Sequence, residues 1–236
     1  MNDIVIIGTG TLSKKIINGL NTFFKITVVG RNKEKLLLLK NKFNIEIMEL
    51  SNVSNLDNKK IIICSKSKIL KNLSKNISFS NSEIFSNMAD IDYFTLKLYF
   101  PNSKTSKVIP NIAAEVNKSS TIFLSEDLNE ETNFIFSKIG KVFKVENEKE
   151  MLISTKILSS GIAYLAEIKS IFINELEKNG INRKKSTFMV DSLFEGFFEI
   201  SFKDEREIIK EVSTPGGITE KGIKIIRELD IKKIFL

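Results

Sequence analysis

The sequence predicts an α/β domain over residues 1–147, followed by an all-α domain over residues 148–236. Short apolar runs rich in β-branched residues recur in the first part of the chain, and stretches with helical spacing separate them. Such runs are typical of a parallel sheet that helices cover on both faces. After about residue 147 the strand-like runs stop and long helical stretches follow. We therefore expect a doubly wound sheet and then a helical domain.

Strand-like and helix-like segments alternate from the start of the chain. Residues 4–7 form an apolar run that is closed by Gly8 and is too short for a helix, so we expect a buried strand. Residues 12–23 then place apolar side chains at helical spacing. The other segments predicted here are strands over 25–29, 45–50, 61–64, 84–88 and 107–109, a helix over 33–43 and a solvated surface segment over 71–82.

The second part contains three stretches with helical periodicity, over residues 151–179, 184–202 and 219–229. The middle stretch is rich in phenylalanine and includes Phe194 and Phe198. These rings could form the domain core or a helix face that binds a second copy of the chain. We favour a homodimer or larger homo-oligomer, because a helical domain of about 90 residues buries little apolar surface by itself.

Composition excludes several classes of protein. The chain of 236 residues has 36 Lys and Arg against 29 Asp and Glu, and the two signs alternate in segments such as 144–150. A basic patch is therefore not indicated, and we expect no nucleic-acid partner. The chain has no His and one Cys, Cys64, which excludes Cys/His zinc sites and histidine-based catalysis, so no metal is expected. Since we find neither a membrane-spanning apolar run nor a signal peptide, we expect a cytoplasmic protein without a membrane partner.

A glycine-rich turn stands between the first expected strand and the first expected helix. Residues 8–13 read Gly-Thr-Gly-Thr-Leu-Ser, in the strand-turn-helix context that a dinucleotide-binding turn requires. The first glycine permits a tight turn, and the second lets a pyrophosphate approach the backbone at the helix N-terminus. Ser13 replaces the usual third glycine or alanine, and a tight turn without a ligand is the alternative. The residues expected to bind a dinucleotide here are Gly8, Thr9, Gly10, Thr11 and Leu12.

The end of the second expected strand indicates which dinucleotide binds. An NAD site would place Asp or Glu there, about 20 residues after the glycine turn, to bind the ribose hydroxyls. This chain has Arg31, Asn32 and Lys33 instead. Because Arg31 and Lys33 could neutralise a ribose 2′-phosphate, we expect NADPH, with NADH as an alternative donor and with Arg31 and Asn32 in the site. Plain solvent exposure is the other interpretation of the two cations.

A second glycine-containing turn precedes the last expected helix. Pro215, Gly216 and Gly217 form a segment whose free N–H groups could hold a carboxylate next to a helix N-terminus. Thr214 and Thr219 flank it and add hydroxyl donors, so an amino-acid-like anion would fit. An ordinary helix-starting loop with Thr219 as its N-cap is the equally supported alternative.

Three further segments, taken with the glycine turn, resemble one known family. They are Lys-Val-Ile-Pro-Asn-Ile-Ala-Ala over residues 107–114, Ser-Ser-Gly-Ile-Ala-Tyr over 159–164 and Val-Ser-Thr-Pro-Gly-Gly-Ile-Thr over 212–219. In this order they resemble the Met-Pro-Asn-Thr-Pro, Ser-Gly-Pro-Ala-Tyr and Ser-Pro-Gly-Gly-Thr-Thr segments of the pyrroline-5-carboxylate reductase family. The resemblance spans nearly the whole chain.

The resemblance implies an N-terminal Rossmann domain and a C-terminal helical domain that builds a dimer. It implies NAD(P)H-dependent reduction of the cyclic imine 1-pyrroline-5-carboxylate to proline. The family's Ala-Val-Lys-Pro segment, which lines its cofactor pocket, corresponds here to Cys64, Ser65, Lys66 and Ser67, with the Lys kept and the Pro lost. On the same resemblance we include Asn111 among the cofactor-binding residues.

An enzyme of this type needs little acid–base machinery of its own. The cofactor carries out the hydride chemistry, so the protein mainly supplies orientation and electrostatics. A protonated iminium is already electrophilic, and a hydroxyl such as that of Thr219 could supply the proton. We therefore expect Thr219 to be the catalytic residue, with Thr214, Gly216 and Gly217 binding the substrate.

Three isoleucines depart from the family pattern, and they leave two alternatives open. Ile112, Ile162 and Ile218 stand where the family usually has Thr, Pro and Thr. A diverged NADP-dependent reductase of another imine or keto substrate is one alternative. A non-catalytic nucleotide-binding paralogue is the other, although the retained glycine turns argue against it.

Overall fold

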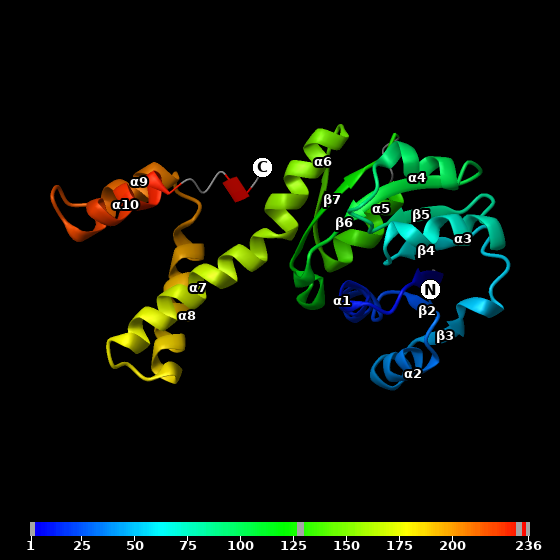
Figure 1. Ribbon diagram of the computed structural model, residues 1–236, viewed down its shortest axis with the longest axis horizontal. Coiled ribbons are helices and arrows are strands. Elements are labelled where there is room, and N and C mark those ends of the chain that lie inside the picture. Colours follow the sequence, from blue (N-terminus) through cyan, green and yellow to red (C-terminus); the bar gives the residue numbers. More distant parts are fainter. Residues whose placement is uncertain (1–2, 127–129, 230–232, 235–236) are drawn as a thin grey trace. The chain divides into compact units, whose positions relative to one another are not determined.

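The computed structural model describes residues 3–126, 130–229 and 233–234, and these fall into two compact units, Met1–Gly161 and Ile162–Leu236 (Figure 1). The first unit contains a sheet built from β1 (Asp3–Ile7), β2 (Lys25–Gly30), β3 (Glu46–Glu49), β4 (Lys60–Ile63), β5 (Glu83–Ser86), β6 (Lys104–Ile109), β7 (Ser119–Leu124) and β8 (Gly140–Lys144). The strand order is β3-β2-β1-β4-β5-β6-β7-β8, and β6 and β7 pair antiparallel whereas the other neighbours are parallel. The predicted α/β fold is confirmed, and the order reverses between β1 and β4 as in a Rossmann sheet.

Helices cover both faces of this sheet, because the strands carry apolar side chains in both directions. In β1, Ile4 and Ile6 face one hydrophobic cluster, and Val5 and Ile7 face the other. The first cluster includes buried side chains of α1 (Thr11–Leu20), α2 (Lys33–Lys42) and α5 (Glu130–Phe136). The second includes those of α3 (Leu70–Asn76) and α4 (Tyr93–Tyr99). Each fully buried isoleucine contributes about 1.5–3 kcal/mol to stability.

Two parts of the first unit differ from the sequence-based expectation. Strands β7 and β8 were not predicted, because Ser119 to Thr121 are polar and β8 alternates half-buried with exposed residues. The segment expected to be a solvated surface, residues 71–82, contains most of α3. Leu70 and Leu73 of α3 are buried in the second cluster, so tertiary packing outweighs the polar composition of its neighbours.

The second unit is helical, as predicted. It consists of most of α7 (Gly161–Lys178) together with α8 (Arg183–Ile200), α9 (Glu205–Val212) and α10 (Ile218–Glu228). Helix α9 was not predicted as a separate element. Between α7 and α8 the chain turns through Gly180, whose φ is +88°, and Asn182 caps α8 by accepting a hydrogen bond from the Lys185 N–H at 3.0 Å.

One continuous helical run connects the units, over Glu148–Lys178. It comprises α6 (Glu148–Ser154), a π-helical turn (Thr155–Ser159) and α7. Contrary to the expectation from sequence, this run is long and apolar enough to cross a membrane by length and composition. It contains Ser159 and Ser160 of the second resembling segment, at the π-helical turn, a feature that often marks functional sites. The domain boundary after residue 147 stays a prediction, since by contacts residues 148–161 group with the first unit.

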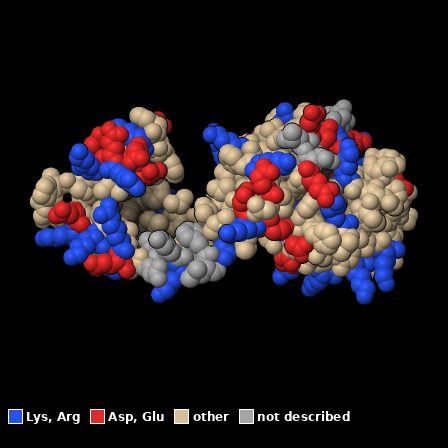
Figure 2. Space-filling view, turned by 90° about the horizontal axis from the view of Figure 1, so that it is seen from above, with Lys and Arg blue, Asp and Glu red and all other residues tan. Residues whose placement is uncertain are grey.

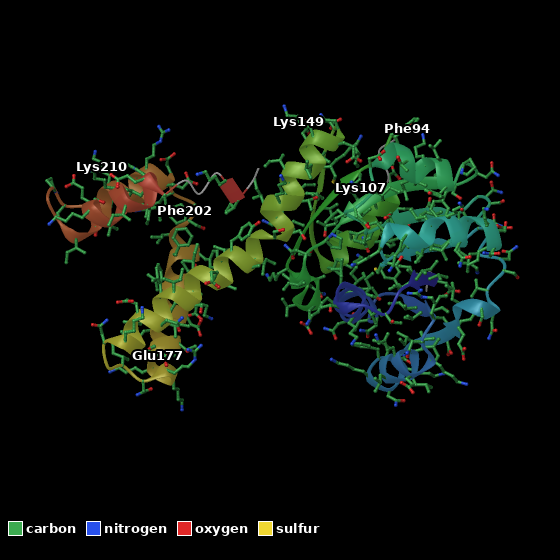
Figure 3. All side chains as sticks on the ribbon, viewed as in Figure 1. Phe94, Lys107, Lys149, Glu177, Phe202 and Lys210 are labelled. Carbon is green, nitrogen blue, oxygen red and sulfur yellow. The ribbon has the colours of Figure 1, made fainter. Side chains whose placement is uncertain are left out.

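Many large apolar side chains of the helical region are exposed. On α7 and α8 they are Leu165, Ile168, Ile171, Phe172, Phe188, Met189, Leu193, Phe197, Phe198 and Ile200. Phe202, labelled in Figure 3, follows α8 and is 84% exposed. An apolar surface of this extent marks an interaction site rather than a solvated face.

Candidate functional site

The turn after β1 requires glycine at its first position. Gly8 has a φ of +130°, and its N–H donates to the Val29 carbonyl oxygen at 2.9 Å. A Cβ on Gly8 would lie 2.3 Å from the Cys64 carbonyl oxygen. Both the backbone conformation and the approach of β4 therefore exclude a side chain here.

Ser13 holds this turn closed. Its buried hydroxyl donates to the Gly8 carbonyl oxygen at 2.7 Å, so the residue in the third position of the motif anchors the first. Gly10 is the N-cap of α1 and no side chain caps the helix, which leaves its first N–H groups available to an anion. A Cβ on Gly10 would meet no atom within 4 Å, so there is open space in front of the helix N-terminus.

A pocket of about 610 Å³ opens at the carboxyl ends of β1, β2 and β4. Ligands of open α/β sheets bind at this edge, where the strand order reverses. Most of the predicted cofactor residues line the pocket: Gly8, Thr9, Gly10, Arg31, Asn32, Cys64, Ser65 and Lys66. Thr11 and Leu12 do not line it; Thr11 begins α1, and the side chain of Leu12 packs against the first hydrophobic cluster.

All the charged side chains that line this pocket are positive. Arg31, Lys35, Lys66 and Lys68 line it, and no Asp or Glu is among its lining residues. None of these four cations forms an ion pair within the described parts of the chain. Such a wall attracts an anionic ligand strongly.

Two details of the positive wall differ from the sequence-based interpretation. Lys33 does not line the pocket, and its Nζ lies 3.7 Å from a carboxylate oxygen of Glu49. Lys35, in the first turn of α2, lines the pocket instead. Asn32 caps this helix, because its side-chain oxygen accepts a hydrogen bond from the Lys35 N–H at 2.8 Å. Lys35 and Lys68 were missed because only the fold shows which lysines of a lysine-rich segment face the pocket.

Cys64, which forms part of the pocket wall, is held by a hydrogen bond to Asn87. The Cys64 thiol donates to the Asn87 side-chain oxygen at 3.1 Å, and the Asn87 amide donates to the Val108 carbonyl oxygen at 2.5 Å. This chain of contacts joins the carboxyl ends of β4, β5 and β6. Burial raises the pKa of the Cys64 thiol to about 12, so the thiol is protonated at neutral pH.

We expect Cys64 to resist alkylation in the folded protein. Because its pKa is raised from 9.0 to about 12, the reactive thiolate is scarce at pH 8, and iodoacetamide should modify it at least about tenfold more slowly than in denaturant. Stability that depends on the neutral thiol is present below pH 9 and is lost as the pH rises toward 12. Mass spectrometry of timed samples measures the rate, and equal rates with and without denaturant would contradict the raised pKa of the thiol.

Asn111 is not brought to the pocket. Its side-chain amide donates to the Leu158 carbonyl oxygen at 2.9 Å, and its side-chain oxygen accepts from the Ala113 N–H at 3.0 Å. Both groups are thus used to hold the π-helical turn and to cap the short helix Ile112–Val116. A cofactor contact by Asn111 stays a prediction that this geometry does not support.

The predicted substrate-binding residues form a tight turn in the second unit. The Gly217 N–H donates to the Thr214 carbonyl oxygen at 2.9 Å, and Gly216 has a φ of +73°. Proline at the second position and glycine with positive φ at the third are typical of a type II turn. A Cβ on Gly217 would lie 2.4 Å from the Thr214 hydroxyl oxygen, so the two residues are in close contact.

The turn leads directly into α10, and its N-cap is Gly217. The alternative in which Thr219 is the N-cap is wrong, because Thr219 lies inside the first turn of the helix. Its hydroxyl makes no hydrogen bond within the described parts of the chain. The Gly216 N–H donates to a carboxylate oxygen of Glu220 at 2.7 Å, so this N–H of the turn is paired with a carboxylate of the same helix.

Most of the comparisons with known proteins point to one family, and one profile over the N-terminal part carries another name. The sequence profile described as pyrroline-5-carboxylate reductase dimerisation matches residues 148–236, and one described as shikimate/quinate 5-dehydrogenase matches residues 1–88. A relative named pyrroline-5-carboxylate reductase from Helicobacter pylori J99 is 25% identical over 98% of this chain and 93% of its own. Pyrroline-5-carboxylate reductase 2 of Bacillus subtilis is 24% identical over 97% of this chain and 88% of its own.

Solved structures show the same fold. The 1-pyrroline-5-carboxylate reductase of Streptococcus pyogenes superposes with a TM-score of 0.83 at 21% identity, over 99% of this chain and 93% of that one. A Plasmodium falciparum pyrroline carboxylate reductase with NADP bound gives 0.80 at 22% identity over the same shares. With the motif order, the dimerisation profile and near-complete coverage of the curated relatives, these findings lead to one conclusion: the chain belongs to the pyrroline-5-carboxylate reductase family.

Proposed function

We propose that this protein is a pyrroline-5-carboxylate reductase that uses NADPH to reduce 1-pyrroline-5-carboxylate to proline. The observation that carries the proposal is the pocket at the ends of β1, β2 and β4, where a glycine turn and four unpaired cations occur together in a member of this family. Relatives of the same name match nearly the whole chain.

The residues of the pocket fit NADPH. The dinucleotide carries about two negative charges on its pyrophosphate and nearly two more on its 2′-phosphate. Gly8 and Gly10 leave room for the pyrophosphate at the N-terminus of α1, and Arg31 and Lys35 lie where the ribose 2′-phosphate would bind. Because no carboxylate lines the pocket to bind the ribose hydroxyls of NADH, we place NADPH first.

The protein's own contribution to the reaction is to bind and orient the substrate and to protonate its imine nitrogen. When bound, NADPH would supply the hydride that the C=N carbon receives. The Gly216 N–H, which donates to the Glu220 carboxylate in this structure, would bind the substrate carboxylate in its place. The hydroxyl of Thr219, the second residue of α10, makes no hydrogen bond within the described parts of the chain and would donate to the imine nitrogen.

A Thr219→Val variant is expected to lower kcat about 100-fold, because removal of a positioned proton donor typically costs 10²–10⁴-fold. Valine has the shape of threonine, and Thr219 caps nothing, so the melting temperature should change little. The assay is NADPH oxidation at its absorbance band with 1-pyrroline-5-carboxylate, against Thr187→Val at a half-buried position of α8 as a control. Full turnover by Thr219→Val would remove it from the mechanism.

The proposed function is tested by the same assay on the unaltered protein. We expect substrate-dependent oxidation with NADPH and slower oxidation with NADH. Cofactor binding without turnover would reject the reaction for this substrate. A panel of other cyclic imines and keto acids should then be tried, because Ile218 beside the turn is 92% exposed and makes its surroundings apolar.

We also propose that the active form is a homodimer in the cytoplasm. The dimerisation profile covers residues 148–236, and the exposed apolar side chains of α7 and α8 lie inside that range. A second copy of the chain would cover this apolar surface, including that of the run Glu148–Lys178. Sedimentation at micromolar concentration tests this, and a monomer would contradict it.

A further inference from the structure

Lys68 lines the cofactor pocket from the wall opposite to Arg31 and was not among the residues expected there. It belongs to the 3₁₀ turn Ser67–Ile69, which follows β4, whereas Arg31 follows β2. Lys68 is exposed, and no carboxylate pairs with it in the described chain. Its charge is therefore available to a ligand in the pocket.

The backbone that carries Lys68 is held on both sides. The Ser67 hydroxyl donates to a carboxylate oxygen of Asp90 at 2.9 Å, and the Ser67 N–H lies 3.3 Å from the same oxygen. On the other side Leu70 is buried in the second hydrophobic cluster, and Ile69 packs against it. Asp90 is thus engaged with Ser67, and the turn presents Lys68 from a fixed position.

Arg31 marks where the adenosine end of a dinucleotide would lie. It lines the cofactor pocket and also a neighbouring hollow of about 490 Å³, which Leu50, Leu73 and Asn76 help to form. Arg31 therefore stands at the junction of the two hollows. A phosphate at this junction would face Arg31 and Lys35 from the β2 side and Lys68 from the β4 side.

We propose that Lys68 is a specificity-determining residue that binds the 2′-phosphate of NADPH together with Arg31 and Lys35. The inference rests on the proposed use of NADPH. A 2′-phosphate held by cations on two walls is bound more tightly than one held from β2 alone, because each charge-assisted contact adds to the same group. NADH lacks that phosphate, so Lys68 should discriminate between the two cofactors.

The experiment measures binding to the full-length protein by calorimetry, with adenosine 2′,5′-bisphosphate and AMP as probes and with NADPH and NADH beside them. Lys68→Gln should raise the Kd of the bisphosphate and of NADPH about tenfold and change the Kd of AMP and NADH less than twofold. Arg31→Gln should show the same selectivity. Lys71→Gln removes an equal charge at an exposed residue of α3 that lines neither hollow, and it should leave all four values unchanged.

Two results would overturn the inference. Equal weakening of NADPH and NADH by Lys68→Gln would place Lys68 at the pyrophosphate, and unchanged binding of all four ligands would remove it from the site. The proposed function fails separately, if the unaltered protein shows no 1-pyrroline-5-carboxylate-dependent oxidation. If the unaltered protein prefers NADPH and the Lys68→Gln variant keeps this preference, the role of Lys68 is contradicted and the proposed function is not.

Discussion

A Gly8→Ala variant is expected to lose NADPH affinity by about 100-fold or more. The added methyl would lie 2.3 Å from the Cys64 carbonyl oxygen, and Gly8 has a φ of +130° that side chains rarely adopt. Either the turn or the end of β4 must move, and both line the cofactor pocket. The Kd is measured by isothermal titration calorimetry.

Two glycine variants separate the site from general stability. Gly180→Ala places a methyl at a comparable positive φ of +88° in the loop before α8, with no atom within 4 Å, and should lower the melting temperature slightly while NADPH binds normally. Gly10→Ala has open space and a φ of −77°, so it should fold normally and yet bind NADPH more weakly, because its methyl enters the pyrophosphate space. Unchanged NADPH affinity in Gly8→Ala would contradict the assignment of this turn.

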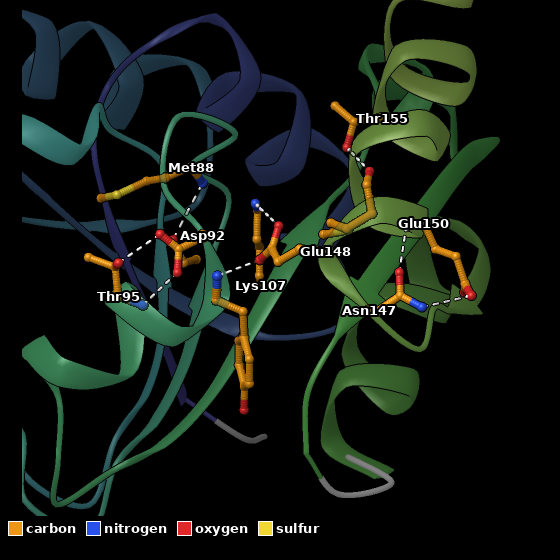
Figure 4. A network of polar contacts seen from close by, with 11 residues as sticks. Met88, Asp92, Thr95, Lys107, Asn147, Glu148, Glu150 and Thr155 are labelled. Carbon is orange, nitrogen blue, oxygen red and sulfur yellow. Dashed lines mark hydrogen bonds and ion pairs between the residues drawn. The ribbon is translucent and has the colours of Figure 1, made fainter.

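The second large effect expected is on stability, in a Glu148→Ala variant. Lys107 on β6 is buried, and its Nζ lies 3.1 Å from a carboxylate oxygen of Glu148 at the start of α6 (Figure 4). The other carboxylate oxygen accepts from the backbone N–H of Tyr93, at the start of α4. Removal of Glu148 leaves Lys107 without its ion-pair partner, which costs about 3 kcal/mol.

For a unit of this size such a loss lowers the melting temperature by roughly 6–12 °C. Thermal unfolding followed by circular dichroism measures it. Glu146→Ala is the matched control, because Glu146 is an exposed residue two positions away whose carboxylate has no contact with Lys107. A Glu148→Ala variant as stable as the Glu146→Ala control would show that the buried charge is satisfied in another way.

The surface carries mixed charge, as the alternating signs in the sequence predict. On the face shown in Figure 2, Lys and Arg are interspersed with Asp and Glu over the first unit rather than gathered on it. The positive residues that matter for the proposed function are the few inside the pocket, and their effect comes from the absence of carboxylates among its lining residues.

Much of the fold could be predicted from local patterns. The runs at residues 4–7 and 61–63 consist of β-branched apolar residues, and each side chain in them is buried on one face or the other. Such runs are stable only in the middle of a covered sheet, so their period and length identify β1 and β4. Strand β8 was not predicted because it lies at the edge of the sheet, where two of its five residues are exposed and none is fully buried.

By itself, the sequence determined the two glycine turns, the helix that follows each and the order of the family motifs, because these depend on residues close together in the chain. Only the tertiary structure decided which side chains share the pocket. In the folded chain Lys35 and Lys68 line the pocket and Lys33 does not. Asn111 binds the π-helical turn instead of lining the pocket. The physical reason is that a binding site depends on which strand ends meet, and the pairing of β1 with both β2 and β4 joins segments more than 20 residues apart.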